Sequence, residues 1–120
     1  MELNVITQQN LPTFEKQAQT FKVFTHPARL AILEILRDGE HCVCHMEAHL
    51  GYRQSYISQQ LSVLREADVI QDRRDGWNIY YRVIDHQIYD VLDTMYQMTG
   101  MKKPQVNHSI QCECPTCSAH

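Results

Sequence analysis

The feature that most constrains the fold is a change of hydrophobic period near residue 69 of the 120-residue chain. Before that point, apolar residues recur at helical spacing. After it, apolar residues alternate over positions 77–83 (Trp77, Ile79, Tyr81, Val83), the pattern of a half-buried strand. Asp75-Gly76 comes just before this run and is a typical two-residue hairpin turn. The sequence therefore predicts helices followed by a β-hairpin with strands at about 69–73 and 77–83.

Four helices are predicted before the hairpin and one after it, from apolar spacing and from turn and cap residues. Pro27 suits a first helical turn, Asp38-Gly39 ends that helix, and Asp85 is a favoured N-cap type. The predicted helices start, in order, at about Thr13, Pro27, Cys42, Arg53 and Asp85. The fold class is mainly α with a β-hairpin wing, in the element order of a winged helix-turn-helix.

Composition and periodicity divide the chain into three parts. Residues 1–12 are expected to form an N-terminal arm, 13–99 the winged helix-turn-helix domain, and 100–120 a Cys-rich tail without periodicity. Apolar residues make up 43%, which indicates a globular domain. No run approaches the roughly 18 apolar residues of a membrane span, and residues 1–10 lack the pattern of a signal peptide. We expect a cytoplasmic protein without membrane contact, in which five cysteines, an odd number, fit a disulfide framework poorly.

The predicted fourth helix has the features of a DNA-reading helix. With Ile57, Leu61 and Leu64 facing the core, its outer side is polar and carries no acid before Glu66. Gln can pair with adenine, Ser can contact bases or phosphates, and the hairpin can reach the flanking backbone. An ordinary solvated polar face remains the alternative. The predicted DNA contacts are Gln54, Ser55, Tyr56, Ser58, Gln59 and Ser62 on the helix, with Arg73 and Arg74 on the wing.

The charge distribution allows DNA binding, but it provides only a small positive surface for phosphate contacts. The whole chain carries −3, whereas residues 53–82 contain five Arg and four acids, about +1. Dimerisation would double this surface, and DNA affinity should then depend strongly on salt.

Three segments in this order resemble the ArsR/SmtB family of metal-responsive repressors: residues 23–33 (VFTHPARLAIL), 57–67 (ISQQLSVLREA), and 72–76 followed by 80–82 (DRRDG, YYR). The resemblance covers about residues 13–98. One departure is Gln60, where the family usually has His, and little functional change is expected from it. The resemblance implies a homodimer, joined through the first and last helices, that binds double-stranded operator DNA. The Phe-rich first helix and the Met and Tyr residues of the last helix agree with this, although packing within one chain is the alternative.

The family's metal box resembles residues 40–46, and both of its thiols are retained as Cys42 and Cys44. Many arsenic sensors of the family have a third Cys where this chain has Glu47. Two residues apart on a regular helix lie about 200° apart around the axis. Cys42 and Cys44 can therefore share an ion only if the helix start is unwound there.

The tail is the expected source of the missing ligands, because it holds Cys112, Cys114 and Cys117. Thiolates select soft ions, and the linker from Gly100 could extend on the order of 40 Å. The hypothesis is a site of Cys42, Cys44 and one or two tail thiols, in one subunit or shared by two. Three thiolates would suit As(III), and four would suit Cd(II), Pb(II) or Zn(II). The apo dimer would bind the operator and the ion would release it.

Other interpretations of the cysteines stay open. The tail could hold its own structural zinc with His108 or His120, the thiols could be a redox or persulfide switch, or Cys44 could simply be buried core. A metal-buffering protein would use the tail but would need neither the wing nor the polar helix face.

Two further kinds of site are not expected. The family's second site, on the last helix, has only the partial start Asp85-His86 here, with no His or Glu from residue 87 to 100. An enzyme is not expected either, because no phosphate loop or paired catalytic acids are evident and a catalytic zinc site would need His and carboxylate ligands. Four histidines are expected to be solvated or capping groups, with His45 the first to test as a ligand: His26, His41, His45 and His49.

Overall fold

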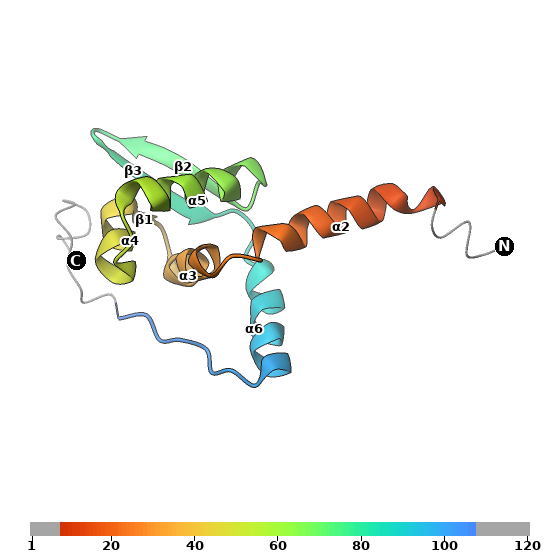
Figure 1. Ribbon diagram of the computed structural model, residues 1–120. Coiled ribbons are helices and arrows are strands. Elements are labelled where there is room, and N and C mark those ends of the chain that lie inside the picture. The colour runs from red at the N-terminus through yellow and green to blue at the C-terminus, as the bar shows by residue number, and fades with distance from the viewer. Residues whose placement is uncertain (1–7, 108–120) are drawn as a thin grey trace.

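The segment before residue 69, which has a helical hydrophobic period, is mainly helical in the computed structural model (Figure 1). The structure describes residues 8–107. The helices are α2 (Leu11–Val23), α3 (Pro27–Ile35) with the 3₁₀ turn η1 (Leu36–Asp38), α4 (Val43–Leu50), α5 (Gln54–Glu66) and α6 (Ile88–Thr99). The strands are β1 (His41–Cys42), β2 (Ile70–Asp75) and β3 (Asn78–Val83). They form an antiparallel sheet in the order β1-β3-β2. The predicted winged helix-turn-helix is confirmed, and α4 and α5 are its two central helices.

The hairpin closes one residue later than predicted. Asp75 is still part of β2 and pairs with Asn78, so the two-residue turn is Gly76-Trp77 rather than Asp75-Gly76. Gly76 has a φ of 62°, in the left-handed region that glycine adopts without strain. Strand β1 was not predicted, because two residues are too short to show alternation. It pairs Cys42 with Tyr80 of β3, so α4 begins at Val43, one residue later than expected.

Two other helix starts differ from the prediction. Helix α2 begins at Leu11, two residues early, with Pro12 in its first turn. Helix α6 begins at Ile88, and Gln87 occupies its N-cap position. Asp85 is not that cap; its Oδ1 accepts a hydrogen bond from Gln87 N at 2.9 Å and so closes the turn that precedes the helix.

The core lies where α3, α4, α5 and the sheet meet. Ile32, Met46 and Leu64 are fully buried there, and Tyr80 is buried in a smaller cluster with Cys42. Helix α2, in contrast, projects away from this body (Figure 1), and its Phe14 and Phe21 are about half exposed, at 48% and 58%.

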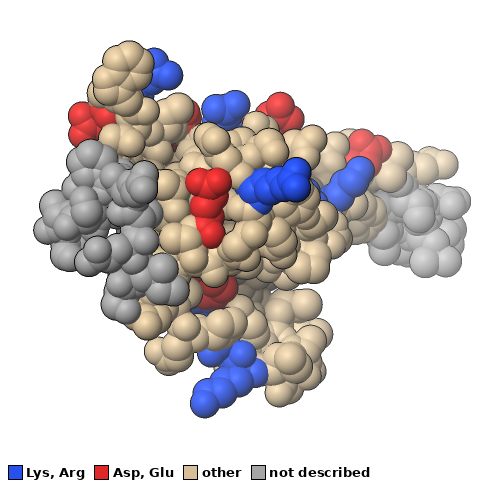
Figure 2. Space-filling view, turned by 60° about the vertical axis from the view of Figure 1, so that its left-hand side comes forward, with Lys and Arg blue, Asp and Glu red and all other residues tan. Residues whose placement is uncertain are grey.

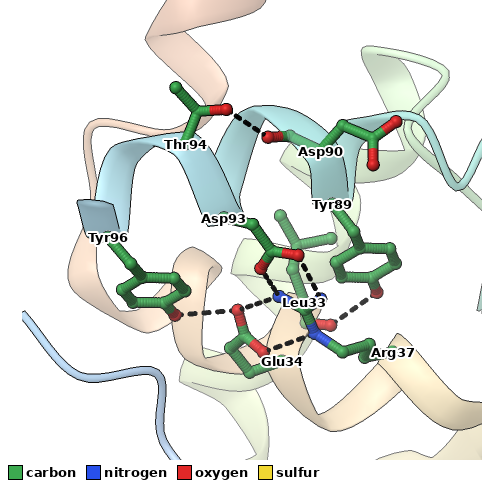
Figure 3. A network of polar contacts seen from close by, with 8 residues as sticks. All are labelled: Leu33, Glu34, Arg37, Tyr89, Asp90, Asp93, Thr94 and Tyr96. Carbon is green, nitrogen blue, oxygen red and sulfur yellow. Dashed lines mark hydrogen bonds and ion pairs between the residues drawn. The ribbon is translucent and has the colours of Figure 1, made fainter. Parts of the chain in front are cut away.

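A polar network fixes α6 to the end of α3 (Figure 3). Arg37 donates to both carboxylate oxygens of buried Glu34 and to Asp93 of α6. Tyr96 donates to Glu34 Oε2 at 2.8 Å, and Tyr89 donates to the Leu33 carbonyl at 2.6 Å. Burial raises the pKa of Tyr96 to about 12, and hydrogen bonding to Glu34 adds to that rise.

The chain turns back after α6. Gly100 ends the helix in the left-handed region, and residues 101–107 then run beneath α3 toward α4 (Figure 1). Val106 packs against the core, and the Asn107 carbonyl oxygen lies 2.8 Å from His49 Nε2 on α4. Among the helices of residues 8–107, none is both long enough and apolar enough to span a bilayer.

Candidate effector site and nucleic-acid interface

Cys42 and Cys44 lie together at the start of α4. Cys42 is the N-cap residue with extended backbone angles (φ −91°, ψ 170°), and Cys44 is in the first helical turn. Their Sγ atoms are 2.8 Å apart. The unwound start that the sequence required for a shared ion is therefore present. Cys42 is the more buried thiol, at 3% exposed, and packs against Tyr80, so Cys44 is not the one buried member of the pair.

A hollow of about 330 Å³ connects this pair with the reading helix and the wing. Glu47 lines it beside the thiols on α4, and Gln54 and Ser58 line it from α5. Trp77, Asn78, Ile79 and Tyr81 close it from the wing side. A group bound to the thiols would thus lie against two predicted DNA-contact residues, and the N-terminal end of α4 favours negative charge there.

The described part of the chain contributes two thiols and no complete metal site. Within residues 8–107, no group of three or more His, Cys, Asp or Glu is placed to hold an ion. The other predicted ligands, Cys112, Cys114 and Cys117, and the alternative zinc ligands His108 and His120 lie outside the described residues.

Three histidines form a column that runs from β1 onto α4. The rings of His41 and His45 stack at 4.2 Å between centroids, and those of His45 and His49 lie at the same distance with a tilt of 40°. His45 is buried, so the expectation of a solvated or capping group is wrong for it, because its neighbours in the column cover its ring. His26 does cap a helix: its Nδ1 accepts from Ala28 N of α3 at 3.4 Å.

The reading helix presents three of its six predicted contacts to solvent. Gln54, Ser55 and Gln59 are exposed, Ser62 is half-buried and Ser58 faces the hollow. Tyr56 is half-buried, with its hydroxyl 3.2 Å from His26 Nε2. Ile57, Leu61 and Leu64 are buried as predicted.

Arg29 and Gln60, for which no site role was predicted, form a hydrogen bond that connects α3 to the buried side of the reading helix α5. Gln60 is buried and accepts from Arg29 Nη1 at 3.1 Å. Arg29 also donates to the carbonyl oxygens of Lys22 and Val23 at the end of α2. The helical period did contain this signal, because position 60 follows buried Ile57 by three residues.

The wing arginines differ from each other. Arg73 pairs with Glu40, the residue before β1, whereas Arg74 makes no ion pair within the described part of the chain. Trp77 at the hairpin tip is fully exposed. On the face in Figure 2, Lys and Arg side chains are separated by acidic and uncharged surface.

Comparisons with known proteins agree with this architecture. The profile of the family described as "Bacterial regulatory protein, arsR family" matches residues 26–72. The "Biofilm growth-associated repressor" of Agrobacterium fabrum is 39% identical over 90 residues, 72% of this chain and 77% of that protein. The "Arsenic resistance transcriptional regulator ArsR1" of Pseudomonas putida is 46% identical over 56 residues, 47% of this chain and 43% of that protein.

The fold also matches solved structures. The crystal structure of NolR from Sinorhizobium fredii superposes with a TM-score of 0.71 and 28% identity, over 79% of this chain and 95% of that one. The chain belongs to the ArsR/SmtB family of winged helix-turn-helix transcriptional repressors and is not an enzyme.

Proposed function

We propose that this repressor binds double-stranded operator DNA as an apo homodimer and releases it when a thiophilic ion binds its cysteines. The ligands are Cys42 and Cys44 with one or two of Cys112, Cys114 and Cys117. Candidate ions are As(III), Cd(II), Pb(II) and Zn(II), because sulfur ligands favour soft ions. The observation that carries the proposal is the 2.8 Å contact between Cys42 Sγ and Cys44 Sγ in a hollow that α5 also lines.

The path of residues 101–107 supports delivery of the tail thiols within one subunit. His49 holds the Asn107 carbonyl, and Cys112 follows five residues later. Five extended residues reach roughly 17 Å, whereas His49 and Cys44 are separated along α4 by about 7.5 Å of helical rise. Tail thiols of the same chain can therefore reach the pair without help from a second subunit.

Exposed apolar side chains support a dimer joined through α2 and α6. Phe14 and Phe21 on α2, and Val91, Met95 and Met98 on α6, are each between 45% and 75% exposed. A second copy of the chain would bury them. Two-fold symmetry would then present two α5 helices to half-sites about one DNA turn apart.

The thiol pair is well placed to change DNA binding because α4 leads directly into α5. A bound ion would fix Cys42 and Cys44 relative to each other, and with them the junction of β1 and α4. Any shift of α4 changes the position of α5 in both halves of the dimer. By linkage, the form that binds the ion tightly must bind DNA weakly to the same extent.

A gel shift on the gene's own upstream region tests the proposal. We expect the reduced wild-type protein to retard that DNA, and Cd(II) or As(III) to reverse the shift. Cys42→Ser and Cys44→Ser should each keep DNA binding and lose reversal. If none of the ions reverses the shift, the metal-responsive mechanism is contradicted. If the protein does not bind this DNA, the proposal that the operator lies in the gene's own upstream region is contradicted.

A truncation after Asn107 separates the two sources of ligands. Thiolate-to-metal absorption should show a lower sulfur count and weaker binding in the truncated chain than in wild type. Unchanged affinity and stoichiometry would assign the site to Cys42 and Cys44 without the tail. Mixed dimers that combine a truncated subunit with a Cys42→Ser subunit should bind no ion if delivery is within one chain, and one ion if it is between chains.

A thiol-oxidation switch is the second candidate, favoured by the same sulfur–sulfur contact. Peroxide would take two electrons and two protons from a thiol pair and be reduced to water, leaving a disulfide. Mass spectrometry should then show the loss of two hydrogens together with loss of the gel shift. A protein that keeps its DNA affinity after such oxidation would contradict this candidate.

A further inference from the structure

Arg73 of the wing is turned back from the hairpin tip toward the thiol site. Its Nε donates to Glu40 at 2.9 Å and 3.1 Å, and its Nη2 contacts the same carboxylate. The guanidinium lies 4.9 Å from the centroid of the Tyr80 ring. Since β3 lies between β1 and β2, the side chain crosses the central strand to reach Glu40.

This placement conflicts with a phosphate contact by the same side chain. Glu40 binds the guanidinium at Nε and Nη2 and neutralises its charge, so a phosphate must compete with that carboxylate for these two donors. The Glu40 carboxylate is in direct contact with the guanidinium, with Arg73 Nε 2.9 Å from one oxygen and 3.1 Å from the other, and it therefore competes with any phosphate.

Glu40 is also directly connected to the cysteines. It precedes His41, and Cys42 follows as the second residue of β1, paired with the same Tyr80 over which Arg73 lies. An ion that fixes Cys42 against Cys44 would favour the arrangement in which β1 is paired with β3 and Glu40 is within reach of Arg73.

We propose that Glu40 is a positioning residue that competes with the DNA backbone for Arg73, and that the state of the thiol pair decides how strongly it competes. The second half of this proposal rests on the proposed function; the first half does not. The paired form has one phosphate-binding cation fewer in each protomer, and ion binding at the cysteines favours that form.

Glu40→Gln in the full-length chain tests the competition. Without metal, it should tighten DNA binding by up to about fivefold per protomer, the range of an exposed ion pair. It should also steepen the dependence of log affinity on log salt by about 0.9 per protomer, the value for one added phosphate contact. Both changes should appear on non-specific duplex DNA at low salt as well as on the upstream duplex, because backbone contacts carry no sequence information.

Two controls separate this from a general charge effect. Glu15→Gln on α2 makes the same change in net charge far from the wing and should produce clearly less tightening. In an Arg73→Gln background, Glu40→Gln should tighten binding no more than Glu15→Gln does, because the two residues act as a pair. Tightening that equals the Glu15→Gln value in the wild-type background, or that exceeds it without Arg73, would overturn the proposal.

The metal arm tests the connection to the thiols. Cd(II) should release Glu40→Gln from DNA several-fold less effectively than wild type, while thiolate absorption shows similar ion binding. Equal release would overturn the connection while leaving the competition for Arg73 in place. If wild type itself is not released, the proposed function fails, whereas the metal-free measurements still decide the role of Glu40.

Discussion

Arg37 of η1 and Asp93 of α6 form an ion pair with Nη2 and Oδ1 2.9 Å apart. The same guanidinium binds buried Glu34, and the Tyr89 ring lies 4.5 Å from it. This cluster joins α3 and η1 to α6, the helix that is proposed to form the dimer (Figure 3). In the proposed dimer, the position of one reading helix relative to the other would depend on this cluster.

Glu34→Gln should destabilise the protein more than Asp93→Asn. The Glu34 side chain is 7% exposed and accepts from Arg37 and Tyr96, so an amide in its place leaves these half-buried donors poorly paired, at a cost of about 1–3 kcal/mol. Asp93 is 44% exposed, and an exposed pair contributes less than about 1 kcal/mol. Urea unfolding at one protein concentration gives both values, and equal losses would contradict this difference.

Alkaline pH should weaken the fold through Tyr96. Its pKa is raised to about 12 in the folded chain, against about 10 in an unfolded one. The unfolded chain therefore loses this proton first. The contribution of Tyr96 to the free energy of unfolding is fully present below pH 10 and is lost as pH rises from 10 to 12. Tyr96→Phe should flatten that fall in pH-dependent urea unfolding. An unchanged slope would place the effect in Tyr89, whose pKa burial also raises.

The periodic parts of the sequence predicted the fold well. Very short elements and contacts between residues far apart in the sequence were not predicted. The Asp75-Gly76 signal placed the hairpin turn to within one residue, and the core positions of α5 were predicted correctly, because both are local signals. Strand β1 has no such signal because two residues cannot alternate. Asp85 was assigned to the wrong turn because an Asx side chain caps a bend as readily as a helix.

The sequence identified Cys42 and Cys44 as a candidate pair of ligands, but it did not predict the contacts around them. The spacing of Cys42 and Cys44 set the condition of an unwound helix start, which the structure meets. Pairing of Arg73 with Glu40, 33 residues away, depends on sheet order, which the sequence does not express. The burial of His45 likewise depends on its packed neighbours.

Met95→Glu should convert the proposed dimer into a monomer. Val91 and Met95 lie four residues apart on one face of α6, and each is nearly half exposed, at 45% and 46%. A charge buried in an apolar interface without a partner costs several kcal/mol. Light scattering after size exclusion should show half the wild-type mass, with Gln97→Glu on another face of α6 as a dimeric control. A Met95→Glu protein of unchanged mass would place the interface elsewhere.

Gln60 should be replaceable by His but not by Leu. His supplies an acceptor for Arg29 Nη1, whereas Leu leaves that donor without Gln60 and should cost about 0.5–1.5 kcal/mol of stability. Because Arg29 also holds the end of α2, Gln60→Leu should weaken DNA binding as well. Thermal unfolding and gel shifts of both variants check this. A Gln60→Leu protein with the wild-type melting temperature and DNA affinity would show that the hydrogen bond between Arg29 and Gln60 is unimportant.

His49→Ala should weaken ion binding by releasing the chain that leads to the tail. His49 Nε2 contacts the Asn107 carbonyl, and loss of one hydrogen bond of about 1 kcal/mol corresponds to roughly fivefold in affinity. In a chain truncated after Asn107, the same substitution should make no difference, because no tail thiols remain to be positioned. Competition with a chelator measures affinity in all four proteins, and His86→Ala in the turn before α6 controls for loss of an imidazole. An equal loss in the full and truncated chains would show that His49 acts on the Cys42–Cys44 pair itself rather than through the tail.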